Sequence, residues 1–247
     1  HAFGTSVSLD SFNAANRVTE LLFNLTAGGA RGSAFIPMFT GYLTRKDQKG
    51  AWRLASGVVN SVLIVLILVS TLMWIFAPFL VERGLFALVP DSSPVQVAET
   101  ARLLRIMLPT VIIFGISGLV MGMLNAHQVF LWPALAPAAY SLGIILGVLL
   151  LPEAWGITRL AIGAVIGAGG HLLLQLPALF RLPARKYELA AGFRDAPVRR
   201  VLRLMLPRIF GAGIVQLNFV ANPIISLSLG AGSASALTWA FTLMLMP

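Results

Sequence analysis

The chain contains no cysteine, so it offers neither a disulfide nor a thiolate for catalysis or metal binding. Its three histidines are far apart and have no acidic partner at ligand spacing, so we expect no metal and no cofactor. Charged residues make up only 11% of the chain, against about 25% in a soluble domain, and 57% of the residues are hydrophobic. This composition excludes a soluble domain and predicts an integral membrane protein, for which we expect no enzymatic activity.

Long runs without charged residues indicate the fold class. They cover residues 54–81, 106–152, 160–180 and 209–247. A transmembrane helix needs roughly 20 apolar residues, so the second and fourth runs have room for more than one helix. The predicted fold is all-α, a polytopic transmembrane helical bundle. The expected spans are 9–43 (broken), 54–81, 100–125, 131–151, 159–180 and 198–230, with a seventh beginning near 233.

The net charge of +9 is concentrated in two predicted loops, 44–53 and 181–203. Both loops follow odd-numbered spans, so they lie on the same side of the membrane. The positive-inside rule places them in the cytoplasm and the first residues of the chain outside. Because this topology signal accounts for the positive charge, we expect no nucleic-acid partner.

One face of the first predicted span is unusually polar. It carries Asp10, Asn13, Arg17, Glu20 and Asn24, spaced by three or four residues. Side chains at this spacing are neighbours along one side of a helix. A face with two acids, a base and two amides is costly against lipid, so it predicts the lining of a watery or ligand-filled cavity. A glycine-rich stretch at 27–32 follows, where we expect the helix to break beside that cavity.

A block between the third and fourth spans points to a family. It reads Leu124-Asn125-Ala126-x-x-x-Phe130-x-x-Pro133-Ala134-x-Ala136-Pro137. This block resembles the MurJ/MviN family, whose members are lipid II flippases of peptidoglycan synthesis within the superfamily of multidrug, oligosaccharidyl-lipid and polysaccharide exporters. Weaker matches follow in family order, at Ala34-Phe35-Ile36-Pro37, Gln175-Leu176-Pro177, Pro207-x-x-x-Gly211 with Gln216 and Asn222, and Gly232-Ser233-x-Ser235.

The resemblance implies a domain organisation. Residues 1–230 would form the N-terminal lobe of a MATE-like flippase, with six spans and the first of them broken near 27–32. Residues 231–247 would begin the C-terminal lobe. The chain starts without a methionine and stops inside an apolar run, so we expect a fragment that lacks the family's first helix and its C-terminal half.

The resemblance also implies a function. We expect a flippase of the bacterial cytoplasmic membrane that moves a lipid II-like, lipid-linked precursor by alternating access. Arg17 and Arg31 would attract the phosphates, and the acids and amides would orient these arginines or bond to sugars. The expected substrate-binding set is Asp10, Asn13, Arg17, Glu20, Asn24, Arg31, Asn222 and Ser235.

The chain departs from the family at several places, and one of them bears directly on the substrate. Phe23 and Asn24 stand where the family usually has an arginine pair, so the chain is a divergent member and has fewer cations for a pyrophosphate. Two alternatives stay open: an exporter of a polysaccharide-lipid or cationic drug on the same fold, and a non-transporting homologue that scaffolds cell-envelope synthesis proteins. In the scaffold, Arg17 and Glu20 would neutralise one another. Membrane lipids are expected partners in every case.

Overall fold

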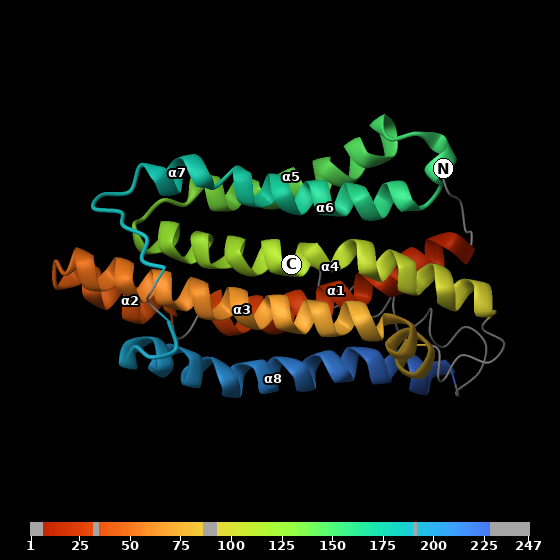
Figure 1. The fold of residues 1–247 in the computed structure, drawn as a ribbon, viewed down its shortest axis with the longest axis horizontal. Coiled ribbons are helices and arrows are strands. Elements are labelled where there is room, and N and C mark those ends of the chain that lie inside the picture. The colour runs from red at the N-terminus through yellow and green to blue at the C-terminus, as the bar shows by residue number, and fades with distance from the viewer. Residues whose placement is uncertain (1–6, 32–34, 86–92, 190–191, 228–247) are drawn as a thin grey trace.

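The computed structural model describes residues 7–31, 35–85, 93–189 and 192–227, and no strand occurs among them. In chain order the elements are α1 (Val7–Arg31), α2 (Phe35–Thr44), α3 (Gln48–Leu80), the π-helical turn η1 (Val81–Leu85), α4 (Pro94–Ala126), α5 (Leu131–Leu150), the 3-10 turn η2 (Glu153–Trp155), α6 (Thr158–Leu173), α7 (Leu176–Phe180) and α8 (Ala196–Leu227). Figure 1 shows the long helices running side by side in an elongated bundle. The predicted all-α helical bundle is confirmed.

Four stretches of the described chain are helical, long and apolar enough to cross a membrane. They are Gln48–Arg83, Pro94–Ala126, Leu131–Leu150 and Thr158–Phe180, which correspond to the predicted second to fifth spans. The first and sixth predicted spans are helical as α1–α2 and α8, but neither is among these four. Both carry several charged residues, α1 along its length and α8 in its first turns. Whether these two cross the membrane stays a prediction.

Helix α4 is the centre of the bundle. It packs against α1, α3 and α6, and in Figure 1 it runs between the α5–α6 pair and α3. In its most apolar stretch 67% of the residues are buried inside the protein, against 22% for α3 and for α5. Large apolar side chains of α3 and α5, such as Leu72, Phe76 and Leu149, are therefore left on the outside, as expected for helices that face acyl chains.

The two predicted loops are shorter than the sequence suggested. Helix α2 ends at Thr44 and α3 begins at Gln48, so only 45–47 of the predicted loop 44–53 lie outside helices. Asp47 caps α3, with its carboxylate accepting a hydrogen bond from the Gly50 amide at 2.8 Å. At the other loop, α8 begins at Ala196 rather than near 198–203. Charged lysine and arginine residues form helices readily, so charge alone marked the helix boundaries too late.

Two spans differ from their predicted helices. Helix α1 continues through Gly28 and Gly29 to Arg31 and α2 starts at Phe35, so the glycine pair in the predicted break at 27–32 is itself helical. A glycine inside a helix costs only about 1 kcal/mol, which packing readily offsets. The predicted span 159–180 divides into α6 and α7 just before Pro177. A proline lacks the amide hydrogen that would bond to the preceding helical turn.

Helices α5 and α6 are in direct backbone contact along a seam of glycines. Gly143 and Gly147 of α5 lie against Gly163 and Gly167 of α6. A β-carbon on Gly147 would lie 2.5 Å from the Gly163 α-carbon and 2.8 Å from the Arg159 carbonyl oxygen, closer than real side chains approach. Only glycine at these positions lets the two backbones touch, which is the usual device for packing helices within lipid.

Candidate functional site

Helix α1 has one face in the bundle and one face outside it. Its buried residues are Ser11, Phe12, Ala15 and Thr19, and the phenylalanine and alanine join an apolar cluster with α4. Three members of the predicted polar face, Asn13, Arg17 and Glu20, are exposed. The spacing of four and three residues keeps these three on the side of α1 away from α4. The apolar face therefore anchors the helix, and this part of the polar face is free to meet a ligand.

The two charges on this face do not pair with one another. Within the described residues, Arg17 and Glu20 form no ion pair, although they are three positions apart on one helix. Among the described residues, the Arg17–Glu20 neutralisation expected for a scaffold is therefore not formed.

Five of the predicted site residues cannot be located by their side chains. Asp10, Asn24 and Arg31 belong to α1 and Asn222 belongs to α8 by their backbone, but their side chains lie outside the described part of the structure. Ser235 lies outside the described residues altogether. The structure therefore brings Asn13, Arg17 and Glu20 onto one exposed face and leaves the other five as predictions.

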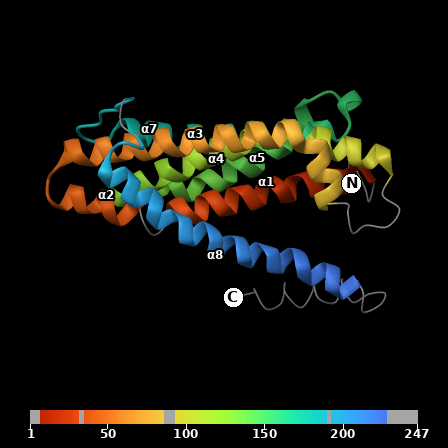
Figure 2. The same ribbon diagram turned by 60° about the horizontal axis from the view of Figure 1, so that its bottom comes forward.

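Helix α8 approaches α1 at one end and leaves it at the other. The two helices are in contact, and Figure 2 shows α8 beginning beside α2 and diverging from the bundle toward Leu227. The two helices run in opposite directions in this view, so α8 is farthest from α1 where α1 begins, which is the half that carries Asn13 and Arg17. This arrangement agrees with the exposure of Asn13 and Arg17.

A second polar group is buried between α4 and α6. Ser117 lies 2.7 Å from Nδ1 of His171, and Gln175 donates from Nε2 to the Ser117 hydroxyl at 2.7 Å and to the His171 carbonyl at 2.9 Å. The Phe114 ring packs edge-on against His171, with ring centroids 5.2 Å apart. Because these polar groups bond to one another inside the protein, they hold α4 to α6 rather than form a ligand site. His171 and Gln175 are four residues apart and so lie on one face of a helix, but no pattern in the sequence places Ser117 of α4 beside them.

Comparison with known proteins identifies the family. The family model described as "Lipid II flippase MurJ" matches residues 1–247. The chain belongs to the MurJ family. It is 30% identical over 254 residues to the lipid II flippase MurJ of Burkholderia cenocepacia, covering 100% of this chain and 48% of that protein. It is 31% identical over 257 residues to the probable lipid II flippase MurJ of Rhizobium meliloti, covering 100% of this chain and 46% of that protein.

A solved structure agrees on the fold. The inward closed conformation of a lipid II flippase MurJ superposes with a TM-score of 0.68 at 24% identity, covering 99% of this chain and 50% of that one. The chain thus spans about half the length of the MurJ proteins it matches. With its family and its four apolar helices, it is a multi-pass protein of the bacterial inner membrane. The family is named for a flippase, which is a transport activity.

In this protein the second basic loop, between α7 and α8, is bound to α3. Trp52 donates from its indole nitrogen to the Pro183 carbonyl at 3.2 Å. Asn60 donates to the carbonyls of Glu188 and Leu189, both at 3.1 Å, and the Glu188 amide donates to the Ser56 hydroxyl at 3.0 Å. These bonds hold the segment between α7 and α8 along the first turns of α3. The sequence predicted only a solvated basic loop there.

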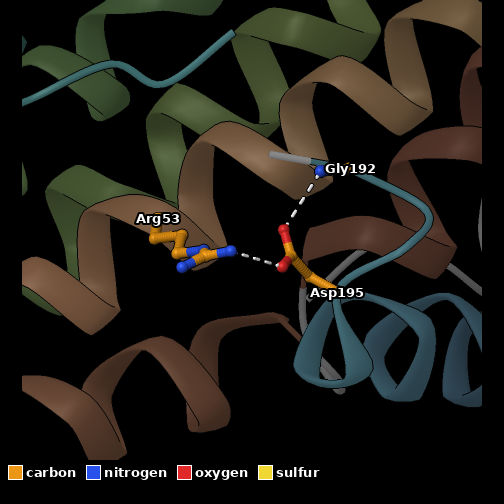
Figure 3. A network of polar contacts seen from close by, with 3 residues as sticks. All are labelled: Arg53, Gly192 and Asp195. Carbon is orange, nitrogen blue, oxygen red and sulfur yellow. Dashed lines mark hydrogen bonds and ion pairs between the residues drawn. The ribbon is translucent and has the colours of Figure 1, made fainter. Parts of the chain in front are cut away.

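An ion pair completes this attachment. Arg53 of α3 bonds to one carboxylate oxygen of Asp195 at 2.9 Å, and the other oxygen accepts from the Gly192 amide at 3.2 Å, as Figure 3 shows. Asp195 directly precedes α8, so the pair fixes the position at which α8 begins. The exposed α1 face and the start of α8 are therefore both held by the same α3–α4 core.

Proposed function

We propose that this MurJ-family protein moves a lipid-linked cell-wall precursor of the lipid II type across the inner membrane by alternating access. Membership of a flippase family supports the activity, and the relatives reported above are named for lipid II. One structural observation supports the site. Arg17 is exposed, unpaired within the described residues, and lies on the polar side of α1 where α8 has diverged.

Different residues of the proposed site bind different parts of the precursor. Arg17 binds a phosphate oxygen, because a guanidinium presents a fork of donors that matches phosphate geometry. Asn13 and Glu20 bond to sugar hydroxyls or orient the arginine. Asp10, Asn24, Arg31, Asn222 and Ser235 complete the proposed set, by their resemblance to the family or their place on the helix. No metal or cofactor is assigned a role.

The proposal includes an organisation and an orientation. Residues 1–230 form the N-terminal lobe and 231–247 begin the second lobe, so a precursor would pass between the two. The short connection 45–47 and the α7–α8 segment face the cytoplasm, because the positively charged residues gather there. The exporter and scaffold alternatives are less well supported, since the relatives share one named cargo and Arg17 does not pair with Glu20.

The test is export of lipid II in cells depleted of their own flippase. A charge-assisted hydrogen bond contributes about 1.5–3 kcal/mol, so R17A is expected to lower the export rate by roughly 10- to 150-fold. The matched control is R102A, which removes an exposed arginine from α4 away from the polar face and should leave export unchanged. Export by R17A at the wild-type rate would exclude Arg17 from the mechanism. A wild-type protein that supports no export at all would overturn the function itself.

A further inference from the structure

A pocket lies between the end of α2 and the start of α8, apart from the α1 face. Its volume is about 590 Å³, within the range of sites that hold a small molecule or a headgroup. One wall comes from α2 and the residue after it, including Met38, Tyr42 and Arg45. The opposite wall comes from the first turns of α8, including Arg200 and Leu204. Two segments that are far apart in the sequence thus each place one arginine in the same pocket.

The pairing of these two arginines can be followed among the described residues. Within the part of the chain that the structure describes, neither Arg45 nor Arg200 forms an ion pair. The two nearest acids in the sequence are already used. Asp47 caps α3 through the Gly50 amide, and Asp195 is held by Arg53 and the Gly192 amide, as Figure 3 shows. Among the described residues, neither arginine of the pocket is therefore held in an ion pair.

The remaining walls fit an amphiphile. Met38 and Leu204 add apolar surface beside the arginines, and Tyr42 adds a phenol that can donate a hydrogen bond. Arg45 and Arg200 sit where α2 ends and α8 begins, at the end of the bundle where basic residues gather. The proposed orientation places this end at the cytoplasmic leaflet, whose anionic headgroups attract basic residues.

We propose that this pocket binds the phosphate group of a membrane lipid, with Arg45 and Arg200 contacting it from opposite sides. The chemistry is shared by two sources, the diphosphate of a lipid-linked precursor and the phosphodiester of a bilayer phospholipid. The site is separate from the α1 face, and the inference takes only its cytoplasmic placement from the proposed function. If the diphosphate is the ligand, the pocket is an initial binding site that the precursor occupies before it reaches α1.

The test measures lipid binding to the purified full-length protein by native mass spectrometry in detergent. Three probes are compared: undecaprenyl diphosphate, phosphatidylglycerol and inorganic pyrophosphate. The double variant R45Q/R200Q is expected to bind its preferred lipid at least tenfold more weakly than the wild type. The control K49Q/R203Q removes two positive charges from the same end of the protein, at exposed positions outside the pocket, and should change binding by less than twofold. R45K/R200K keeps the charge and loses the fork, and should give an intermediate affinity.

Each result has a stated meaning. Tighter binding of the diphosphate lipid than of phosphatidylglycerol supports an initial binding site for the precursor, and equal binding supports a general phospholipid site. An equal loss of binding in R45Q/R200Q and K49Q/R203Q overturns the proposal, because general surface charge would then explain the binding. No loss in either variant also overturns it, because the two arginines would then not contribute to binding. Pyrophosphate bound as tightly as the lipids overturns the lipid assignment. If the wild-type protein exports the precursor and R45Q/R200Q binds lipid as tightly as the wild type, only this inference is refuted. If the wild-type protein exports no precursor, the proposed function is refuted.

Discussion

The glycine seam between α5 and α6 allows a stability prediction that is independent of transport. Replacing Gly147 by alanine adds one methyl group, which would lie 2.5 Å from the Gly163 α-carbon and 2.8 Å from the Arg159 carbonyl oxygen. Ordinary contacts of this kind lie at 3.4–4 Å, so the two backbones must separate by about 1 Å. Both opposing atoms are backbone, so no side chain can rotate out of the way. Overpacking of this kind costs about 1–3 kcal/mol.

The expected result is a lower thermal unfolding temperature for G147A in detergent, by about 2–12 °C for that free-energy loss in a chain of this size. Tryptophan fluorescence during heating measures it. The matched control is G169A on α6, because a β-carbon there meets nothing within 4 Å. Alanine favours a helix over glycine by about 1 kcal/mol, so G169A should be neutral or slightly stabilising. If G147A unfolds at the same temperature as G169A, the close approach of α5 and α6 is not real.

Two further stability predictions follow from the polar contacts. S117A removes the hydroxyl that His171 and Gln175 share, and it should cost about 1 kcal/mol of unfolding free energy because buried polar groups lose a partner. The control S141A changes an exposed serine of α5 and should cost almost nothing. Equal losses in the two variants would show that the buried cluster does not hold α4 to α6. D195N breaks an ion pair in which the arginine is 61% exposed, so the loss should stay below about 1 kcal/mol at low salt and vanish near 1 M salt. Thermal unfolding at both salt concentrations checks this, and a loss that persists at high salt would mean that Asp195 acts through its Gly192 bond instead.

Helix positions followed well from the sequence, but helix ends did not. A charge-free run of 20 or more residues has few alternatives to a membrane helix, so the second to fifth spans were found. The ends depended on local contacts that composition does not report. Asp47 extends α3 to an earlier start, and Pro177 divides the fifth span into two helices. The glycine pair 28–29 remained helical, because a glycine permits a break without requiring one.

The candidate site was predictable in part for the same reason. A spacing of three and four residues places side chains on one face of any helix, so Asn13, Arg17 and Glu20 could be grouped before their exposure was known. Arg45 and Arg200 could not be grouped in this way. They are far apart in the sequence and read as charges that set membrane topology. Their approach depends on where α8 begins, which the Arg53–Asp195 pair and the bonded α7–α8 segment decide.

The sequence by itself determined the membrane class, the positions of the apolar helices, the polar face of α1 and the MurJ family, because hydropathy, helical period and family motifs are local properties of the chain. Only the tertiary structure decided which faces are buried, that Arg17 and Glu20 stay apart, and that two distant arginines share a pocket. These outcomes depend on helix packing, and packing is set by contacts between segments that are not neighbours in the sequence. The direct contact of Gly147 with Gly163 is one example, since each glycine alone is unremarkable and only the pair brings α5 onto α6.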